Sequence, residues 1–486
     1  RPVAVPSTRG TGAGPAQRDE IAVIDPVGLT AKRLGELGVA NLRNLGDGTQ
    51  RPAVLPKAII VGREALIADE KELWQERAEH AAEQGLPPRE RLEQTQRLRA
   101  LPDWIADAVR SGARVLICEQ TERVLTNTFG FRAVAVGVER AFVRCPWHAT
   151  MRGIDNELLS FWRGSSTLTV DRTLAGPVGD PHVDWLNFDN TRVWKWGSYG
   201  QLASAVIEKP HCGDFLPIAD CEFDLAYTPL LEYRHGDGRV LFCQLDISNR
   251  TEDEPVARRL WANLIAWLQG AEKLSAPPRR TGYVGDKAGR DLLATLKVSL
   301  DNQLDPAALT ARDLLIVGRG ARDRLGGARE QVAAAVRNGA IVVCLAPTPD
   351  DIEGWLPVPI KLDAREVIWT PVGGNDQWIL RGIGPSELHW RGRLKIWAVA
   401  EAPSGSITTR TGLITAVPFG SGWVVICAAT PDMFDADNPQ RLYFRLSRER
   451  CAQMLSRLLA NCGASFDAPV LENLATPPAF RANLLR

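Results

Sequence analysis

The sequence lacks the features that would assign its function class at once. Its 486 residues carry 58 Lys and Arg against 58 Asp and Glu, so no overall charge attracts nucleic acid or an anionic membrane surface. Long hydrophobic runs are also missing: the longest, at 341–346 and 423–429, fall far short of the roughly 18 residues of a membrane span. We therefore expect no nucleic-acid partner and no membrane partner.

Cysteine motifs are absent too. The nine cysteines cannot all pair, and they form neither a CxxC pair nor a Cys/His cluster with zinc spacing. Cys118, Cys243, Cys344 and Cys427 each lie inside an apolar, strand-like run, where a free cysteine behaves as a small hydrophobe. We expect no disulfide framework, no metal and no cofactor.

What is present is an internal repeat of domain size. Three short motifs recur at nearly one offset: AVRSGA at 108–113 as AVRNGA at 335–340, RGI at 152–154 and again at 381–383, and WRG at 162–164 and again at 390–392. A chain of this length is also too long for one core, since single cores stop growing near roughly 250 to 300 residues. Both observations predict two related domains.

Two looser matches locate the differences between the copies. AIIVGR at 58–63 matches LLIVGR at 314–319, and GDGRVLFC at 236–243 matches GSGWVVIC at 420–427, but at different offsets. The first copy therefore carries additional residues. The predicted organisation is a linker at 1–20, domain 1 at 21–271 with insertions at about 69–100 and 169–221, a linker at 272–281, domain 2 at 282–468 and a tail at 469–486.

Each copy alternates apolar runs with helical patterns. In the first copy, IAVID at 21–25, AIIVG at 58–62 and RVLIC at 114–118 are continuous apolar strands separated by helical segments. Such strands require a parallel sheet covered on both faces. The predicted fold class is α/β, with two doubly wound, flavodoxin-like domains and mostly parallel sheets.

The later segments carry a family resemblance. WRGSSTL, FDLAYTPLLEYRHGDGRVLFCQLDIS and VARRLWANLIAWL together resemble the class I glutamine amidotransferase-like domains. These lie near the ThuA-like and β-galactosidase trimerisation-domain families and occur in the C-terminal parts of large bacterial glycoside hydrolases. The resemblance covers residues about 20 to 271 well and 282–468 more weakly. It implies a non-catalytic module of a larger glycoside hydrolase.

A class I glutaminase needs a nucleophilic cysteine in a G-x-C-x-G turn and a His-x-Glu pair, and neither is present in the sequence. The catalytic candidates that remain are Cys118 with Glu119, at a strand end, and the His182/Asp184 pair, whose alternative is a surface loop. Arg63 and Arg319 follow equivalent strands, where doubly wound folds bind ligands, although a surface ion pair is the alternative for each.

Tryptophan is abundant, with 15 residues, and its ring both fills cores and stacks on sugars. Trp104, Trp261, Trp267 and Trp355 lie in helical or apolar patterns and are predicted core residues, whereas the repeated Trp162 and Trp390 are expected to perform one packing task twice. A third group lies in the insertion of the first copy and is a candidate contact for carbohydrate or another domain: Trp185, Trp194, Lys195 and Trp196.

Three functions stay open. The leading hypothesis is a non-catalytic interaction module whose partners are other domains of its parent chain, with carbohydrate and a second copy of the chain as further partners. The alternatives are a hydrolase with an unrecognised site and a free-standing sugar-binding protein. Free cysteines favour the cytoplasm, but the resemblance favours export, so we expect a secreted or periplasmic protein.

Overall fold

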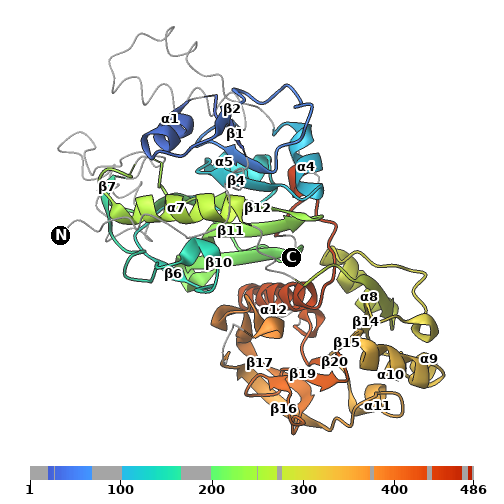
Figure 1. Cartoon of the computed structure of the whole chain (residues 1–486). Coiled ribbons are helices and arrows are strands. Elements are labelled where there is room, and N and C mark those ends of the chain that lie inside the picture. The colour runs from blue at the N-terminus through green and yellow to red at the C-terminus, as the bar shows by residue number, and fades with distance from the viewer. Residues whose placement is uncertain are drawn as a thin grey trace.

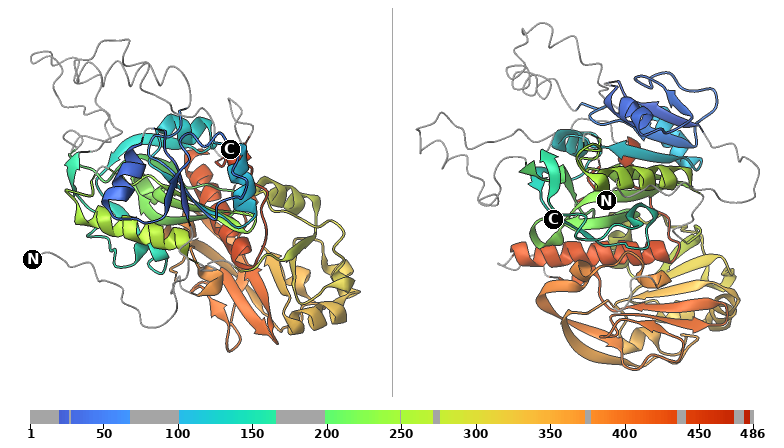
Figure 2. Two further views of the ribbon diagram at one scale, coloured as in Figure 1. Left: turned by 45° about the horizontal axis from the view of Figure 1, so that its top comes forward. Right: turned by 60° about the vertical axis from the view of Figure 1, so that its left-hand side comes forward.

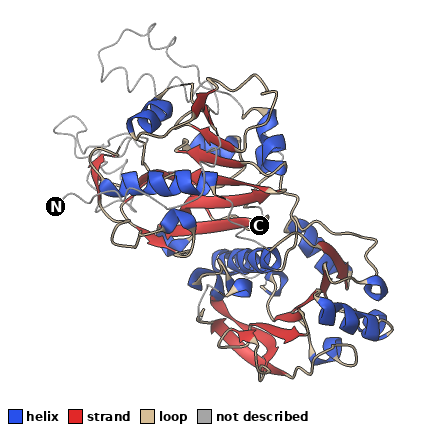
Figure 3. Ribbon diagram, viewed as in Figure 1, coloured by secondary structure: helices blue, strands red, loops and turns tan. Residues whose placement is uncertain are grey.

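The computed structural model describes residues 20–26, 28–67, 101–165, 199–248, 250–270, 276–372, 377–434, 441–472 and 480–483. Two large sheets dominate it, one of ten strands and one of six, and helices pack beside each (Figures 1 and 3). The α/β fold class is thus confirmed. We call the part built around the first sheet the first unit, and the part built around the second sheet the second unit.

Five parallel strands form one half of the first sheet, in the order β2-β1-β3-β4-β12. They are β1 (Ile21–Ile24), β2 (Leu42–Asn44), β3 (Ala58–Val61), β4 (Arg114–Cys118) and β12 (Gly238–Cys243). The strands other than β2 are buried along almost their whole length, because helices cover both faces. One face packs against α1 (Leu29–Glu36) and α7 (Pro255–Gln269), and the other against α4 (Asp103–Arg110) and α5 (Glu122–Asn127).

The other half of the first sheet is antiparallel. Its strands are β5 (Ala133–Val138), β6 (Ala141–Val143), β9 (Ala203–Glu208), β10 (Phe215–Cys221) and β11 (Tyr227–His235), and β7 (Trp162–Ser165) pairs separately with β8 (Tyr199–Gly200). Residues 199–221, predicted to be the end of an insertion, supply β9 and β10, whose hydrogen bonds to β11 make them part of the sheet.

The second sheet repeats the parallel arrangement with fewer strands. It contains β13 (Arg280–Val284), β14 (Asp313–Val317), β15 (Ile341–Leu345) and β20 (Gly422–Cys427), followed by antiparallel β19 (Ile414–Phe419) and β18 (Ile407–Thr408). A separate antiparallel pair joins β16 (Leu362–Trp369) to β17 (His389–Val399). Helices α8 (Lys287–Thr295) and α12 (Arg441–Asn461) pack on one face, and α9 (Arg322–Gly326), α10 (Arg329–Asn338) and α11 (Pro349–Ile352) on the other.

Short 3-10 helices complete the described secondary structure: η1 (Ala149–Met151), η3 (Phe223–Leu225), η4 (Pro306–Ala308), η5 (Trp378–Leu380), η6 (Pro385–Leu388), η7 (Pro431–Met433) and η8 (Val470–Glu472). None of the helices in the described residues combines the length and apolar character needed to cross a bilayer.

The repeated motifs occupy corresponding places in the two units. The two AVR-Gly-Ala motifs end α4 and α10 and lead into β4 and β15. The two RGI motifs follow η1 and η5, and their glycines, Gly153 and Gly382, both have positive φ angles of 67° and 77°. Trp162 and Trp390, on β7 and β17, are both fully buried. These shared positions support the internal repeat.

Helix α12 lies between the strands of its own unit and the first unit (Figure 2). Its apolar residues enter the core of the second unit. Its polar residues contact the first unit: Gln453 Nε2 donates to Lys209 O at 2.8 Å, and Arg457 pairs with Asp214 at 2.8 Å. The residues after α12, expected to be a tail, also return to the first unit, where Val470 and Phe480 join its core.

Candidate functional site

Buried ionisable side chains gather at the carboxyl edge of the parallel strands in the first unit. Asp25 follows β1, Arg63 follows β3, Glu119 follows β4, and Asp246 follows β12. Each is at most 3% exposed. Parallel strands end at one edge of their sheet, which is where α/β folds bind ligands, so we treat this carboxyl-edge cluster as the candidate functional site.

Both carboxylate oxygens of Glu119 accept hydrogen bonds from Ser248. Its Oε1 accepts from the backbone N of Ser248 at 2.8 Å, and its Oε2 accepts from Ser248 Oγ at 2.9 Å. Burial raises the pKa of Glu119 to about 7, against the opposing effects of Arg63 and of the Ser248 hydrogen bonds, while nearby Asp246 raises it further. A carboxyl that titrates near neutrality has the property of a general acid or base.

The neighbouring thiol has the opposite character. Cys118 is the last residue of β4, is fully buried, and packs in the apolar cluster beneath α1 and α7. Burial raises its pKa well above the usual range, and the negative charge of Glu119 raises it further. Because the thiolate is the nucleophilic form, Cys118 is a core cysteine, as the sequence pattern indicated for its strand.

Short contacts connect the residues that follow β1 and β3 to each other and to α1. Asp25 Oδ2 accepts from the backbone N of Ala31 at 2.8 Å, in the first turn of α1. The backbone N of Arg63 donates to Thr30 Oγ1 at 2.8 Å. The strands approach so closely that a Cβ on Gly62 would lie 2.7 Å from Asp25 Oδ1. Glycine at this position is therefore required by the closeness of the aspartate.

The last strand end adds a third acid and a second arginine. Asp246 Oδ2 accepts from Ser204 Oγ at 2.6 Å and lies 3.7 Å from Nη2 of Arg250. Arg250 also donates to the backbone O of Gln201. Sequence reasoning did not select Asp246 or Arg250, because both follow a strand in a segment without a recognisable catalytic motif.

The same edge of the second unit carries different residues. Ala346 stands directly after β15, where the first unit has Glu119, and Thr430 stands third after β20, where the first unit has Asp246. Arg319 follows β14 as Arg63 follows β3, but Arg319 is exposed. The two arginines follow the ends of their strands alike, but they differ in burial.

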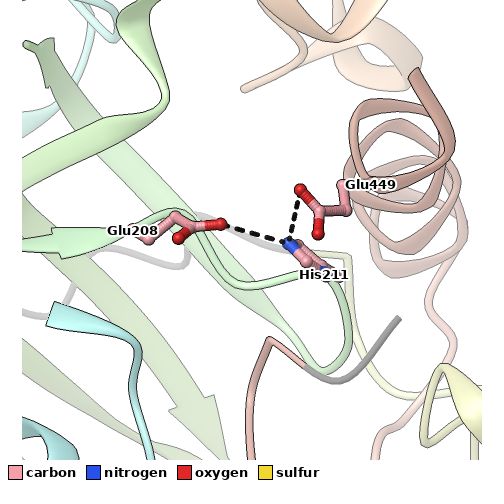
Figure 4. Close-up of side chains that lie close together, drawn as sticks. All are labelled: Glu208, His211 and Glu449. Atoms are coloured by element: carbon pink, nitrogen blue, oxygen red, sulfur yellow. Dashed lines mark ion pairs between the residues drawn. The ribbon is translucent and has the colours of Figure 1, made fainter. Parts of the chain in front are cut away.

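A second polar cluster lies between the units. Glu208, at the end of β9, His211, in the β9–β10 connection, and Glu449, on α12, point toward one another (Figure 4). His211 Nε2 lies 3.8 Å from Glu208 Oε1 and 3.8 Å from Glu449 Oε2. Sequence reasoning missed this cluster, because Glu449 is far from the other two residues along the chain. Only the short spacing of Glu208 and His211 was visible.

A third group of charges lies nearby at the same junction. Lys209 Nζ is 2.9 Å from Glu387 Oε1 and 3.3 Å from Asp220 Oδ1, and Arg144 pairs with both acids. Burial alone would raise the pKa of Glu387, but the charges of Arg144 and Lys209 outweigh it and hold that pKa well below its usual range. The four groups form a closed ionic network that joins the first unit to η6.

The other residues of interest fall into two groups. The first is His148, a histidine outside the predicted catalytic candidates, which is buried and contacts Thr150 Oγ1 at 2.7 Å and Glu232 Oε2 at 3.2 Å. The second group comprises the candidates of the first-copy insertion, which lie outside the described residues: His182, Asp184, Trp185, Trp194, Lys195 and Trp196.

No protein-family model matches the chain, and no curated protein matches it. Among solved structures, the chain is similar to the cytoplasmic protein STM3548 from Salmonella typhimurium, with 11% identity and a TM-score of 0.28 over 51% of this chain and 98% of that one. It is also similar to the cytoplasmic protein STM1381 from Salmonella typhimurium LT2, with 12% identity and a TM-score of 0.26 over 52% of this chain and 100% of that one.

Proposed function

We propose that this chain is a non-catalytic interaction module, in which two α/β units are fastened into one scaffold. The observation that carries the proposal is the junction. Helix α12 packs the polar residues Gln453 and Arg457 against the first unit. The network of Arg144, Lys209, Asp220 and Glu387 adds buried charges to the same interface. Relative motion of the units would expose or unpair these groups at high cost.

The state of Cys118 also supports a non-catalytic function. An amidotransferase-like enzyme would need a reactive thiolate at this level of the fold, and the Cys118 thiol is buried with a raised pKa. Membership of a larger carbohydrate-active protein is part of the same proposal, and its support is the sequence resemblance. We also propose that Trp185, Trp194 and Trp196 contact carbohydrate, and titration with oligosaccharides tests this contact.

A second candidate function is acid or base catalysis at Glu119. The specific observation in its favour is a pKa of about 7 in a buried carboxyl next to a serine hydroxyl, a combination that occurs at active sites. Assays against glutamine, esters and aryl glycosides distinguish the two functions. We expect no turnover, whereas turnover that Glu119→Gln abolishes would replace the interaction module with a hydrolase.

The scaffold itself is tested by Glu387→Ala. This change leaves Lys209 and Arg144 buried with Asp220 as their remaining acidic partner, and removing one member of a buried ionic group costs about 3 to 5 kcal/mol. Calorimetry and tryptophan fluorescence measure the unfolding. We expect one unfolding transition in the wild type and two in the variant.

The matched control is Glu366→Ala, since Glu366 forms an exposed pair with Arg393 at 3.7 Å and such pairs contribute at most about 1 kcal/mol. A wild-type chain that already unfolds in two separate transitions would contradict the rigid scaffold.

A further inference from the structure

The cluster of Glu208, His211 and Glu449 has an unusual balance of contacts. All three residues are buried, with His211 only 1% exposed, and neither ring nitrogen of His211 has a hydrogen-bond partner among the described residues. Buried polar atoms are normally hydrogen-bonded, because an unsatisfied donor or acceptor costs about 1 to 3 kcal/mol. By contrast, the equally buried His148 uses both of its nitrogens.

The two carboxylates add a second unusual feature. Two acids with one imidazole between them form a set of oxygen and nitrogen atoms that can each donate an electron pair to a cation. One ligand atom from each residue lies within 4.8 Å of the others, so a single cation could contact all three.

We propose that Glu208, His211 and Glu449 bind one divalent cation of the zinc class, which connects the first unit to α12. An imidazole with carboxylates suits Zn²⁺ and similar transition metals, whereas Mg²⁺ and Ca²⁺ prefer oxygen ligands alone. Zinc bonds of about 2.0 to 2.2 Å place tetrahedral ligand atoms roughly 3.4 Å apart. The two 3.8 Å separations from His211 require a contraction of a few tenths of an ångström, and the oxygen atoms of Glu208 and Glu449, which lie within 4.8 Å of each other, must also move together.

The cluster contains a competing cation. Arg132 Nη2 lies 3.0 Å from Glu208 Oε1 and 3.4 Å from Glu449 Oε1, and Arg445 Nε lies 3.4 Å from the same Glu449 oxygen. The Arg132 side chain is 38% exposed, so it can move into solvent when a metal enters. Arg132 therefore opens a route to the site and weakens binding by competition.

The backbone around the site is fixed from two sides. Ser456 Oγ, on α12, donates to His211 O at 3.2 Å, and the backbone N of His211 donates to Ala482 O at 3.0 Å. Asn483 Nδ2 donates to the backbone O of Glu208 at 3.3 Å. Since the ligand-bearing segment is held before binding, little ordering entropy opposes metal capture.

The experiment uses the full chain, freed of metal by chelation and titrated with Zn²⁺. We expect one zinc per chain by elemental analysis, and a rise in the melting temperature with added zinc. His211→Ala and the near-isosteric Glu449→Gln should lose both effects. Arg132→Ala should bind zinc several-fold more tightly, a result that a purely ionic cluster would not give, because there the arginine only stabilises the acids.

The matched control is His148→Ala, which removes a buried histidine paired with Glu232 and should lower stability while leaving the zinc content at one per chain. Circular dichroism establishes that each variant is folded before its zinc content is compared. The proposal is overturned if the folded wild type takes up no zinc, or if His211→Ala and Glu449→Gln bind zinc as the wild type does.

Discussion

The carboxyl edges of the two sheets differ in buried charge, although both units pair their parallel strands in the same order. In the first unit, Glu119 and Asp246 follow β4 and β12 and are almost fully buried. In the second unit, Ala346 and Thr430 occupy the corresponding places, and the parallel strands keep the same order of pairing. The charged cluster is therefore not required for the sheet to form.

Burying charge is costly unless the groups are paired and hydrogen-bonded. The first unit meets that cost with specific partners, such as Ser248 for Glu119 and Ser204 for Asp246. Since the second unit forms the same parallel strands without this arrangement, strand pairing alone does not require buried charge at the carboxyl edge.

The largest effect is expected where the two units are most alike. Trp162→Ala and Trp390→Ala should each lower the free energy of unfolding by about 3 to 5 kcal/mol, because each removes a large, fully buried ring and leaves a cavity. Chemical denaturation measures the loss. Trp369, which is 55% exposed, is the control, and Trp369→Ala should change stability by no more than about 0.5 kcal/mol. If either buried tryptophan could be replaced by alanine without loss of stability, the two positions would not be equivalent.

The arginines at equivalent strand ends should differ. Arg63→Met removes a buried positive charge that favours ionisation of Glu119, and we expect a loss of about 3 kcal/mol. Arg319 is exposed, so Arg319→Met should have an effect within about 0.5 kcal/mol. Urea unfolding of the two variants under identical conditions checks the contrast, and similar losses would show that the two edges are alike.

The next largest difference between the two carboxyl edges is expected in the way the free energy of unfolding depends on pH. The pKa of Glu119 is raised to about 7 in the folded protein from an ordinary value of 4.5. As the pH rises, Glu119 loses its proton at a lower pH in the unfolded protein than in the folded protein. Its contribution to the stability of the folded state is therefore greatest below about pH 4.5 and is lost as the pH rises through 7. The amide in Glu119→Gln does not ionise, so this variant should not lose stability through this titration. Denaturation between pH 5 and 8 should therefore show the variant gaining on the wild type by on the order of 1 to 3 kcal/mol.

Glu122→Gln is the control for this measurement, because Glu122 is the first residue of α5 and is only half-buried. It should leave the pH profile of the wild type unchanged. If the Glu119→Gln profile also matches that of the wild type, Glu119 does not titrate in this range.

The smallest effect is expected from the partner of Glu119. Ser248→Ala removes the hydroxyl hydrogen bond of 2.9 Å but keeps the backbone donor, which should cost about 1 to 2 kcal/mol above pH 7 and raise the pKa of Glu119 further. The exposed Asp432 holds the corresponding place after β20, and Asp432→Ala should be neutral. An equal effect of the two changes would argue against a specific role for Ser248.

Much of the fold could be predicted from local patterns. Continuous apolar runs predicted β1, β3, β4, β14 and β15 as buried parallel strands, because such runs are stable only between two covering layers. Trp104, Trp261, Trp267 and Trp355 were predicted to be core residues and are buried. The antiparallel role of β9 and β10 was not predicted, since a gap in the repeat carries no information on strand pairing.

The sequence by itself determined the alternation of strands and helices, the repeated motifs and the burial of the strand cysteines, because each depends on residues close together in the chain. Only the tertiary structure decided which polar residues meet. Glu449 occupies the polar side of a helix, which alone would be interpreted as a solvated face, yet α12 buries that side against the first unit and brings Glu449 to His211 and Glu208. Contacts between distant segments depend on how the units pack, and local periodicity does not encode that packing.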